Sequence, residues 1–169
     1  MLNSDSFLSK LLLRNGGWLT IPPLAITFGL WSHLPPPYAM EHFWKDIPSW
    51  LGLPENIFRI IVFALPTLLY FGRAERGQKL GWFLYFGGLL AYLASYVAQV
   101  LFAESTWSLS ALGFTAPAWT TTFWFCGIGM VCKNTWLPLP WNRMIYVGCA
   151  VLFLIFHVTH TGLIFSRLF

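Results

Sequence analysis

Charged residues are scarce in this chain of 169 residues, because Asp, Glu, Lys and Arg together make up 9% of it. Soluble domains contain about 25% of such residues. Four stretches of 23 to 28 residues have no charged residue at all, and they are bounded by Arg14 and Glu41, Lys79 and Glu104, Glu104 and Lys133, and Arg143 and Arg167. A helix of roughly 20 apolar residues crosses a bilayer core. With 57% hydrophobic residues, the sequence predicts an integral membrane protein built as one helical domain over residues 1–169.

Several motifs that would identify a chemistry are also missing. The three cysteines form no C-x-x-C pair, which argues against thiol–disulfide exchange. Glycine patterns of nucleotide sites, the G-x-S-x-G nucleophile motif and the H-E-x-x-H zinc motif do not occur,. The few basic residues flank apolar stretches, so we expect no nucleic-acid partner. The sequence identifies no cofactor, and we expect no metal site.

The spacing of the charges predicts a transmembrane helical bundle of five spans. Their approximate bounds are 18–34, 56–72, 80–103, 112–132 and 144–165. A four-span alternative remains, because Arg59 leaves a charge-free run of only 13 residues before Arg73 in the second span. Pro22 and Pro23 are expected to kink the first span. No small-x-small cleavage pattern follows that span, so we expect it to be retained rather than cleaved as a signal peptide.

The distribution of Lys and Arg predicts the orientation of the bundle. Cytoplasmic loops carry an excess of these residues. With the N-terminus in the cytoplasm, the inner segments hold Lys10, Arg14, Arg73, Arg76, Lys79, Lys133 and Arg143, and the outer segments hold Lys45, Arg59 and Arg167. This distribution predicts a cytoplasmic N-terminus and an external C-terminus, in a plasma or inner membrane.

The segment after the first span, Pro35–Pro54, mixes aromatic and charged residues and has proline at both ends. Such a mixture suits the headgroup layer of a bilayer. We therefore predict a short amphipathic interfacial helix over about Ala39–Trp50 on the outer surface.

Polar residues gather in the outer halves of the predicted spans. On the third span one face carries Gly88, Tyr92, Ser95, Tyr96 and Gln99, at spacings of three and four,. Polar faces in a membrane bundle turn inward, because lipid cannot satisfy their hydrogen bonds. We expect an outward-facing polar pocket among the third, fourth and fifth spans, with Pro35–Pro54 near its mouth. A second row of small residues, Gly87, Ala91 and Ser95, predicts close approach of another helix.

The candidate site residues follow from this placement. The predicted ligand-binding residues are Arg59, Tyr92, Tyr96, Gln99 and His33, and the candidate catalytic residues are His157, His160 and Glu104. An alternative exists for each charged or titratable group. Arg59 can bind a phosphate or carboxylate, extend to the headgroup layer, or pair with Glu55 one turn away. The two histidines can ligate a metal or haem or bond to neighbouring helices.

Three functions are compatible with these patterns. The first is a membrane bundle that binds a lipid or other amphipathic ligand, or that packs into a membrane assembly. The second is a membrane-embedded enzyme acting on a lipid or isoprenoid at the outer leaflet, since an ionisable residue inside a membrane is a functional candidate. The third is a small transporter, which is disfavoured by the plain inner halves of the spans. The expected partners are membrane lipids, with a membrane-protein partner or a homo-oligomer as further possibilities.

Overall fold

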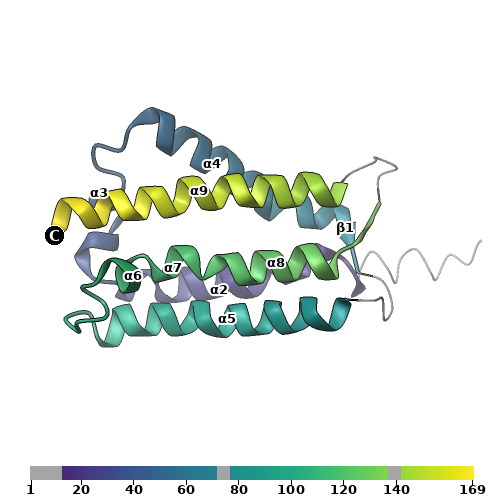
Figure 1. Ribbon diagram of the computed structural model, residues 1–169, viewed down its shortest axis with the longest axis horizontal. Helices are drawn as coiled ribbons and strands as arrows, with labels where there is room; N and C mark the ends of the chain where they lie inside the picture. Colours follow the sequence, from purple (N-terminus) through teal and green to yellow (C-terminus); the bar gives the residue numbers. More distant parts are fainter. Residues whose placement is uncertain (1–12, 72–76, 137–141) are drawn as a thin grey trace, which may run out of the picture.

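The computed structural model describes residues 13–71, 77–136 and 142–169, which are mostly helical (Figure 1). The basic residues Lys10, Arg73 and Arg76, on which part of the predicted orientation rests, lie outside the described residues. Three described helices are long and apolar enough to cross a membrane, which indicates membrane association: Ser49–Leu68, Gln78–Leu101 and Arg143–Leu168. They correspond to α4 (Ser49–Ala64) with the 3₁₀ turn η4 (Leu65–Leu68), to α5 (Gln78–Leu101) and to α9 (Asn142–Leu168).

The first predicted span is a composite of three helical pieces. They are the 3₁₀ helix η1 (Gly16–Thr20), helix α2 (Ile21–Leu30) and the 3₁₀ helix η2 (Trp31–His33). Pro22 and Pro23 lie in the first turn of α2, where no intrahelical partner awaits their missing N–H groups. The prolines therefore fall where the 3₁₀ helix passes into the α-helix, and they begin the α-helix instead of interrupting it.

The fourth predicted span is broken into α6 (Ala111–Phe114), α7 (Ala116–Trp119) and α8 (Thr121–Val131). Pro117 has no N–H to donate to the carbonyl of Gly113, four residues earlier. The Gln99 side chain donates to that carbonyl instead, with an Nε2–O distance of 2.9 Å. No piece is long enough to span a bilayer by itself, so helix length does not confirm the five predicted spans.

The predicted interfacial helix over Ala39–Trp50 is not confirmed either. A 3₁₀ turn, η3 (Pro36–Tyr38), leads into α3, which covers only Met40–Phe43. The chain then turns, and Asp46 has a φ of 54°, a left-handed conformation that no helix continues through. Helix α4 begins directly after Pro48, so it starts seven residues before the predicted second span.

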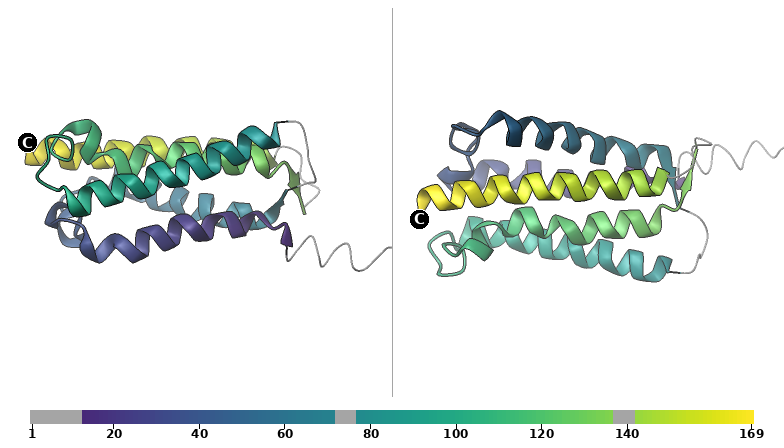
Figure 2. Two further views of the ribbon diagram at one scale, coloured as in Figure 1. Left: turned by 90° about the horizontal axis from the view of Figure 1, so that it is seen from below. Right: turned by 45° about the horizontal axis from the view of Figure 1, so that its top comes forward.

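The helices lie side by side along the long axis, with α5 against α8 and α4 against α9 (Figures 1 and 2). Close approach of α5 and α8 requires glycine on both. A Cβ atom at Gly88 would lie 2.5 Å from the backbone nitrogen of Trp124, and one at Gly127 would lie 2.5 Å from that of Tyr85. The row through Gly87 and Ala91 is not the packing face, because a Cβ at Gly87 would meet nothing within 4 Å.

A two-stranded antiparallel sheet closes the end of the bundle opposite α3 and α6 (Figure 1). Strand β1 (Leu69–Tyr70) pairs with β2 (Asn134–Thr135), and Tyr70 also forms a bridge with Asn15. The sequence did not predict this sheet, and strands this short leave little periodicity to detect.

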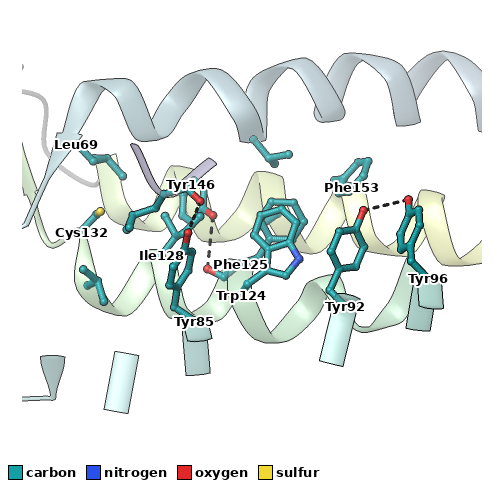
Figure 3. Packing of buried hydrophobic residues seen from close by; sticks show 14 residues of the cluster. Leu69, Tyr85, Tyr92, Tyr96, Trp124, Phe125, Ile128, Cys132, Tyr146 and Phe153 are labelled. Carbon is teal, nitrogen blue, oxygen red and sulfur yellow. Dashed lines mark hydrogen bonds between the residues drawn. The ribbon is translucent and has the colours of Figure 1, made fainter. Parts of the chain in front are cut away.

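Aromatic side chains fill the interior between the helices (Figure 3). Tyr85, Trp124, Phe125 and Tyr146 are at most 2% exposed. The Trp124 and Phe125 rings lie 3.9 Å apart at their centroids. This layer separates the end that carries the sheet from the end at which the polar cluster lies.

Candidate functional site

The carboxylate of Glu55 is the centre of a buried polar cluster between α4 and α9. Its side chain is completely buried. Arg59, one turn later on α4, donates to Oε1. His157 and His160 approach from α9, with Nδ1 of His157 2.9 Å from Oε1 and Nδ1 of His160 2.5 Å from Oε2. The i, i+4 and i, i+3 spacings place each pair on one helix face, so two helices supply the whole cluster.

The ring of His160 fixes the place of one proton. Its Nε2 lies 2.8 Å from the carbonyl oxygen of Phe43, which can only accept a hydrogen bond, so Nε2 carries a hydrogen,. Nδ1 faces the Glu55 carboxyl group. The proton on that contact belongs either to an imidazolium beside a carboxylate or to a carboxylic acid beside a neutral imidazole. In both arrangements Glu55 and His160 together carry no net charge.

His160 also ties the segment that contains α3 to the bundle. Its ring centroid lies 4.4 Å from that of Phe43 and 4.7 Å from that of Trp44. Together with the Phe43 carbonyl bond, these contacts enclose His160 completely. The residue therefore joins the polar cluster to the segment that covers it.

Arg59 leaves the cluster toward aromatic rings. One terminal nitrogen donates to the Asn56 side chain at 3.0 Å. The guanidinium carbon lies 5.4 Å from the centre of the Trp44 ring and 5.9 Å from that of Phe153, within the range of cation–π attraction. The guanidinium group is thus held between Glu55 and an aromatic wall.

A cavity of about 220 Å³ adjoins the cluster. Eleven of its lining residues are aromatic, and the remainder are two leucines, two threonines, Arg59 and His157. The lining residues come from α2, α4, α5, α8, α9 and the segment before α4: Leu24, Thr27, Phe28, Trp31, Leu34, Tyr38, Phe43, Trp44, Arg59, Phe63, Tyr92, Tyr96, Thr121, Trp124, Phe125, Phe153 and His157. The expected polar pocket among the last three spans is therefore an aromatic cavity that α2 and α4 also line.

Trp124 presents an unpartnered donor at this cavity. Its indole Nε1 has no hydrogen-bond partner among the described residues, although the side chain is only 1% exposed. In Figure 3 the indole nitrogen lies on the side of the ring that faces Tyr92. A buried N–H without an acceptor costs about 1–3 kcal/mol, so an acceptor atom inside the cavity would stabilise the protein.

Tyrosine hydroxyls also line the cavity, but those of Tyr38, Tyr92 and Tyr96 already have hydrogen-bond partners within the protein. The Tyr92 hydroxyl lies 2.7 Å from that of Thr27 and donates to Tyr96 at 3.2 Å. Tyr38 donates to the carbonyl of Phe114 at 2.6 Å. Burial, and to a lesser extent the neighbouring Tyr96, raises the pKa of the Tyr38 hydroxyl above its usual range, which keeps Tyr38 neutral and able to donate.

The predicted site residues are only partly brought together. Arg59, Tyr92, Tyr96 and His157 line the one cavity, whereas His160 lies behind Glu55 and Phe43.

The other three predicted residues lie elsewhere. Gln99 is occupied by the Gly113 carbonyl. His33 is exposed, with its Nδ1 3.2 Å from the Ser32 hydroxyl. Glu104 is exposed in the turn after α5. These positions shared a predicted depth with the cluster, but depth alone does not place residues around one cavity.

Sequence reasoning missed the tryptophans of the site and the role of Glu55 as its hub. Trp44 and Trp124 line the cavity, yet in a chain with ten tryptophans no spacing distinguishes them from interfacial anchors. Glu55 was recognised only as a partner for Arg59. A buried carboxylate needs hydrogen-bond donors, and the histidine pair at the same end of the bundle was the one signal in the sequence that could have pointed to these contacts.

A metal centre does not emerge from the described residues. No group of three or more His, Cys, Asp or Glu side chains among residues 13–71, 77–136 and 142–169 is arranged to hold a metal ion. Both oxygens of Glu55 are instead engaged by nitrogen atoms. The arrangement favours hydrogen bonding and proton sharing.

Comparisons of this chain with protein-family models, with curated proteins and with solved structures find no match.

Proposed function

We propose that this chain is a small integral membrane protein that binds a lipid or other amphipathic ligand in the aromatic cavity. The observation that carries the proposal is the combination of an apolar cavity with polar groups at its wall. Arg59 and His157 supply charge and hydrogen bonding, and Trp124 supplies an N–H group without a partner. Ligand sites in proteins have this composition, in which a few polar groups orient a molecule held mainly by apolar contacts.

The ligand proposal is tested by co-purification. The protein is purified in a mild uncharged detergent, and bound lipids are identified by native mass spectrometry and solvent extraction. Leu24→Trp places a large ring in the cavity and should remove the bound ligand. Ile21→Trp is the matched control, because Ile21 lies on the same helix, is 49% exposed and does not line the cavity. Equal amounts of the same lipids in both variants would contradict the proposal.

We also propose five membrane crossings. The composite segment Gly16–His33 has ten α-helical and eight 3₁₀ residues, which gives a length of about 31 Å at 1.5 and 2.0 Å per residue. The broken segment Ala111–Val131 runs alongside α5 and is of similar length. Both match a hydrocarbon core of about 30 Å, so 3₁₀ geometry compensates for the small number of residues in the first crossing.

Five crossings place the chain ends on opposite sides of the membrane. The excess of Lys and Arg in the segments at the end that carries β1 and β2 favours a cytoplasmic location for that end. A reporter that is active only in the cytoplasm should give no signal when fused after Phe169 and a strong signal when fused before Met1. Signals from both fusions would mean an even number of crossings.

A membrane-embedded enzyme is a second candidate, and the geometry of His157 favours it. Glu55 engages Nδ1 of His157, while Nε2 has no partner among the described residues. A carboxylate that orients an imidazole in this way can prepare the free nitrogen to act as a base. Turnover of membrane lipids by the purified protein is measured by mass spectrometry. The His157→Gln variant should fold normally but show no turnover. If the unaltered protein leaves the composition of the added lipids unchanged, the enzyme candidate is contradicted.

A further inference from the structure

The polar cluster beside the cavity carries an uncompensated positive charge. Glu55 and His160 together are neutral wherever their shared proton resides, because the Phe43 carbonyl requires a hydrogen on His160 Nε2. The guanidinium of Arg59 is permanently protonated. The unit formed by Glu55, Arg59 and His160 therefore has a net charge of +1, even though Arg59 and Glu55 form an ion pair.

No acidic side chain at the cavity offsets this charge. Among the described residues that line the cavity there is no Asp or Glu. The lining is otherwise aromatic, aliphatic or hydroxylic, and such groups solvate a cation poorly compared with water. A positive charge beside an apolar cavity favours an anionic group within it.

The donors that an anion would need are still available. A guanidinium group has five N–H donors, and Asn56 and Glu55 engage one terminal nitrogen each. His157 lines the cavity beside Arg59, and its Nε2 atom is on the ring edge opposite the bond to Glu55. That nitrogen can accept the proton of an acidic group or, once protonated, donate to its anion. Carboxylate and phosphate oxygens match both partners.

The size of the cavity limits the apolar part of the ligand. Its volume of about 220 Å³ corresponds to the liquid volume of roughly seven water molecules at about 30 Å³ each. Since a methylene group is similar in size to a water molecule, this volume holds about seven methylene groups of one chain and leaves no room for a second full chain. The cavity is open on one side, so the rest of a ten-carbon chain extends through the opening.

We infer that the cavity binds a single-chain amphiphile through a carboxylate or phosphate group held by Arg59 and His157. This inference rests on the proposed function and narrows it to the charge, the number of chains and the orientation of the ligand. The anionic group lies at the end of the cavity near Trp44, and the chain extends toward Trp124.

The inference is tested with four probes of one chain length. Decanoate, decyl phosphate, decanol and decylammonium, each brominated at the far end of the chain, are titrated into the protein in an uncharged detergent. Bromine quenches tryptophan fluorescence, and Trp31, Trp44 and Trp124 all line the cavity. We expect the two anions to bind at least about tenfold more tightly than decanol, the factor that one charge-assisted hydrogen bond supplies. Decylammonium should bind most weakly.

Acetate and inorganic phosphate provide the anion without the chain. They should fail to displace bromodecanoate at concentrations at which unlabelled decanoate displaces it fully. Displacement by these small ions at equal concentration would identify a site for a free oxyanion and would overturn the assignment of an amphiphile.

Two variants locate the anion. Arg59→Gln removes the charge, and His157→Phe removes the ring nitrogens while retaining an aromatic ring against Phe153, whose ring centroid lies 5.0 Å from that of His157. Either change should reduce the preference for anions over decanol without weakening decanol binding. Lys45→Gln is the control, because Lys45 is exposed, follows Trp44 and does not line the cavity. Anion preference that is lost only in the Lys45 variant would overturn the inference.

The outcomes separate this inference from the proposed function. Equal binding of all four probes would overturn the anionic assignment and leave the amphipathic ligand in place. If the brominated probes quench the fluorescence of the protein no more than that of tryptophan in detergent micelles, the proposed function itself is contradicted. If either variant fails to fold, the ranking of the four probes with the unaltered protein still decides the matter.

Discussion

A pair of adjacent glycines offers a sensitive test of the packing between α5 and α8. Alanine at Gly88 would place its Cβ atom 2.5 Å from the Trp124 backbone nitrogen and 2.8 Å from the Cβ atom of Phe123. Alanine at Gly87 would meet no atom within 4 Å. The two substitutions add the same atom to neighbouring positions of one helix, so they differ only in what that atom meets.

The expected magnitude follows from two opposing terms. Replacing glycine by alanine in a helix gains about 1 kcal/mol in helix propensity at either position. At Gly88 the new carbon needs a separation of about 3.5 Å, so α5 and α8 must move apart by about 1 Å. Overpacking of this kind costs about 1–3 kcal/mol. Because the propensity term cancels between the variants, Gly88→Ala should be less stable than Gly87→Ala by about 1–3 kcal/mol.

The assay is unfolding of the purified protein by titration with a denaturing detergent, followed by far-ultraviolet circular dichroism. Gly127→Ala provides an independent check from the other helix, because its Cβ would lie 2.5 Å from the Tyr85 backbone nitrogen. It should behave like Gly88→Ala. Equal stability of the Gly87 and Gly88 variants would refute the packing argument. Greater loss at Gly87, together with a change in oligomeric state, would show instead that Gly87 packs against a second copy of the chain.

Two further predictions concern single polar contacts. Glu55→Gln should destabilise the protein by on the order of 2–4 kcal/mol, because Arg59 and two histidines lose their carboxylate partner. The loss is limited because the Arg59 side chain is one-third exposed and keeps part of its hydration,. The same detergent titration measures this loss, and an unchanged midpoint would contradict it. Tyr38→Phe should lower the free energy of unfolding by about 1 kcal/mol, because the Phe114 carbonyl loses its donor,. The stacked rings of Tyr38 and Phe114, 4.8 Å apart at their centroids, should remain in place. Thermal unfolding in detergent tests this, and a loss above about 3 kcal/mol would indicate that the hydroxyl supports more than one bond.

The sequence predicted two of the three long helices well, because charge and apolar length determine them together, whereas α4 begins seven residues before the predicted second span. The predicted span 80–103 corresponds to α5 over Gln78–Leu101, and the predicted span 144–165 lies within α9. Prolines were interpreted less accurately. Their effect depends on whether they fall in the first turn of a helix, as Pro22 and Pro117 do, or inside a formed helix, as Pro54 does in α4, and composition alone does not specify which case applies.

The candidate site was predictable in part for a related reason. Helical spacing placed His157 and His160 on one face, and the pair of Glu55 and Arg59 was recognisable from its i, i+4 separation. What joins these pairs is the packing of α4 against α9, across more than 100 residues of sequence. A single sequence contains no information on which of two equally apolar helix faces meet. For the same reason Gly87 was chosen over Gly88, since both belong to rows of small or polar residues.

The small sheet at the end of the bundle has a consequence for the order in which the chain can assemble. Tyr70 and Leu69 pair with Asn134 and Thr135, which the ribosome makes 64 and 66 residues later. At about 5–20 residues per second, β1 waits roughly 3–13 seconds for its partner. The neighbouring Phe71 N–H donates instead to an earlier segment, the Arg14 carbonyl, at 3.0 Å. Closure of this end therefore waits until α8 has been made, so α4 and α5 are both synthesised before β1 has its partner.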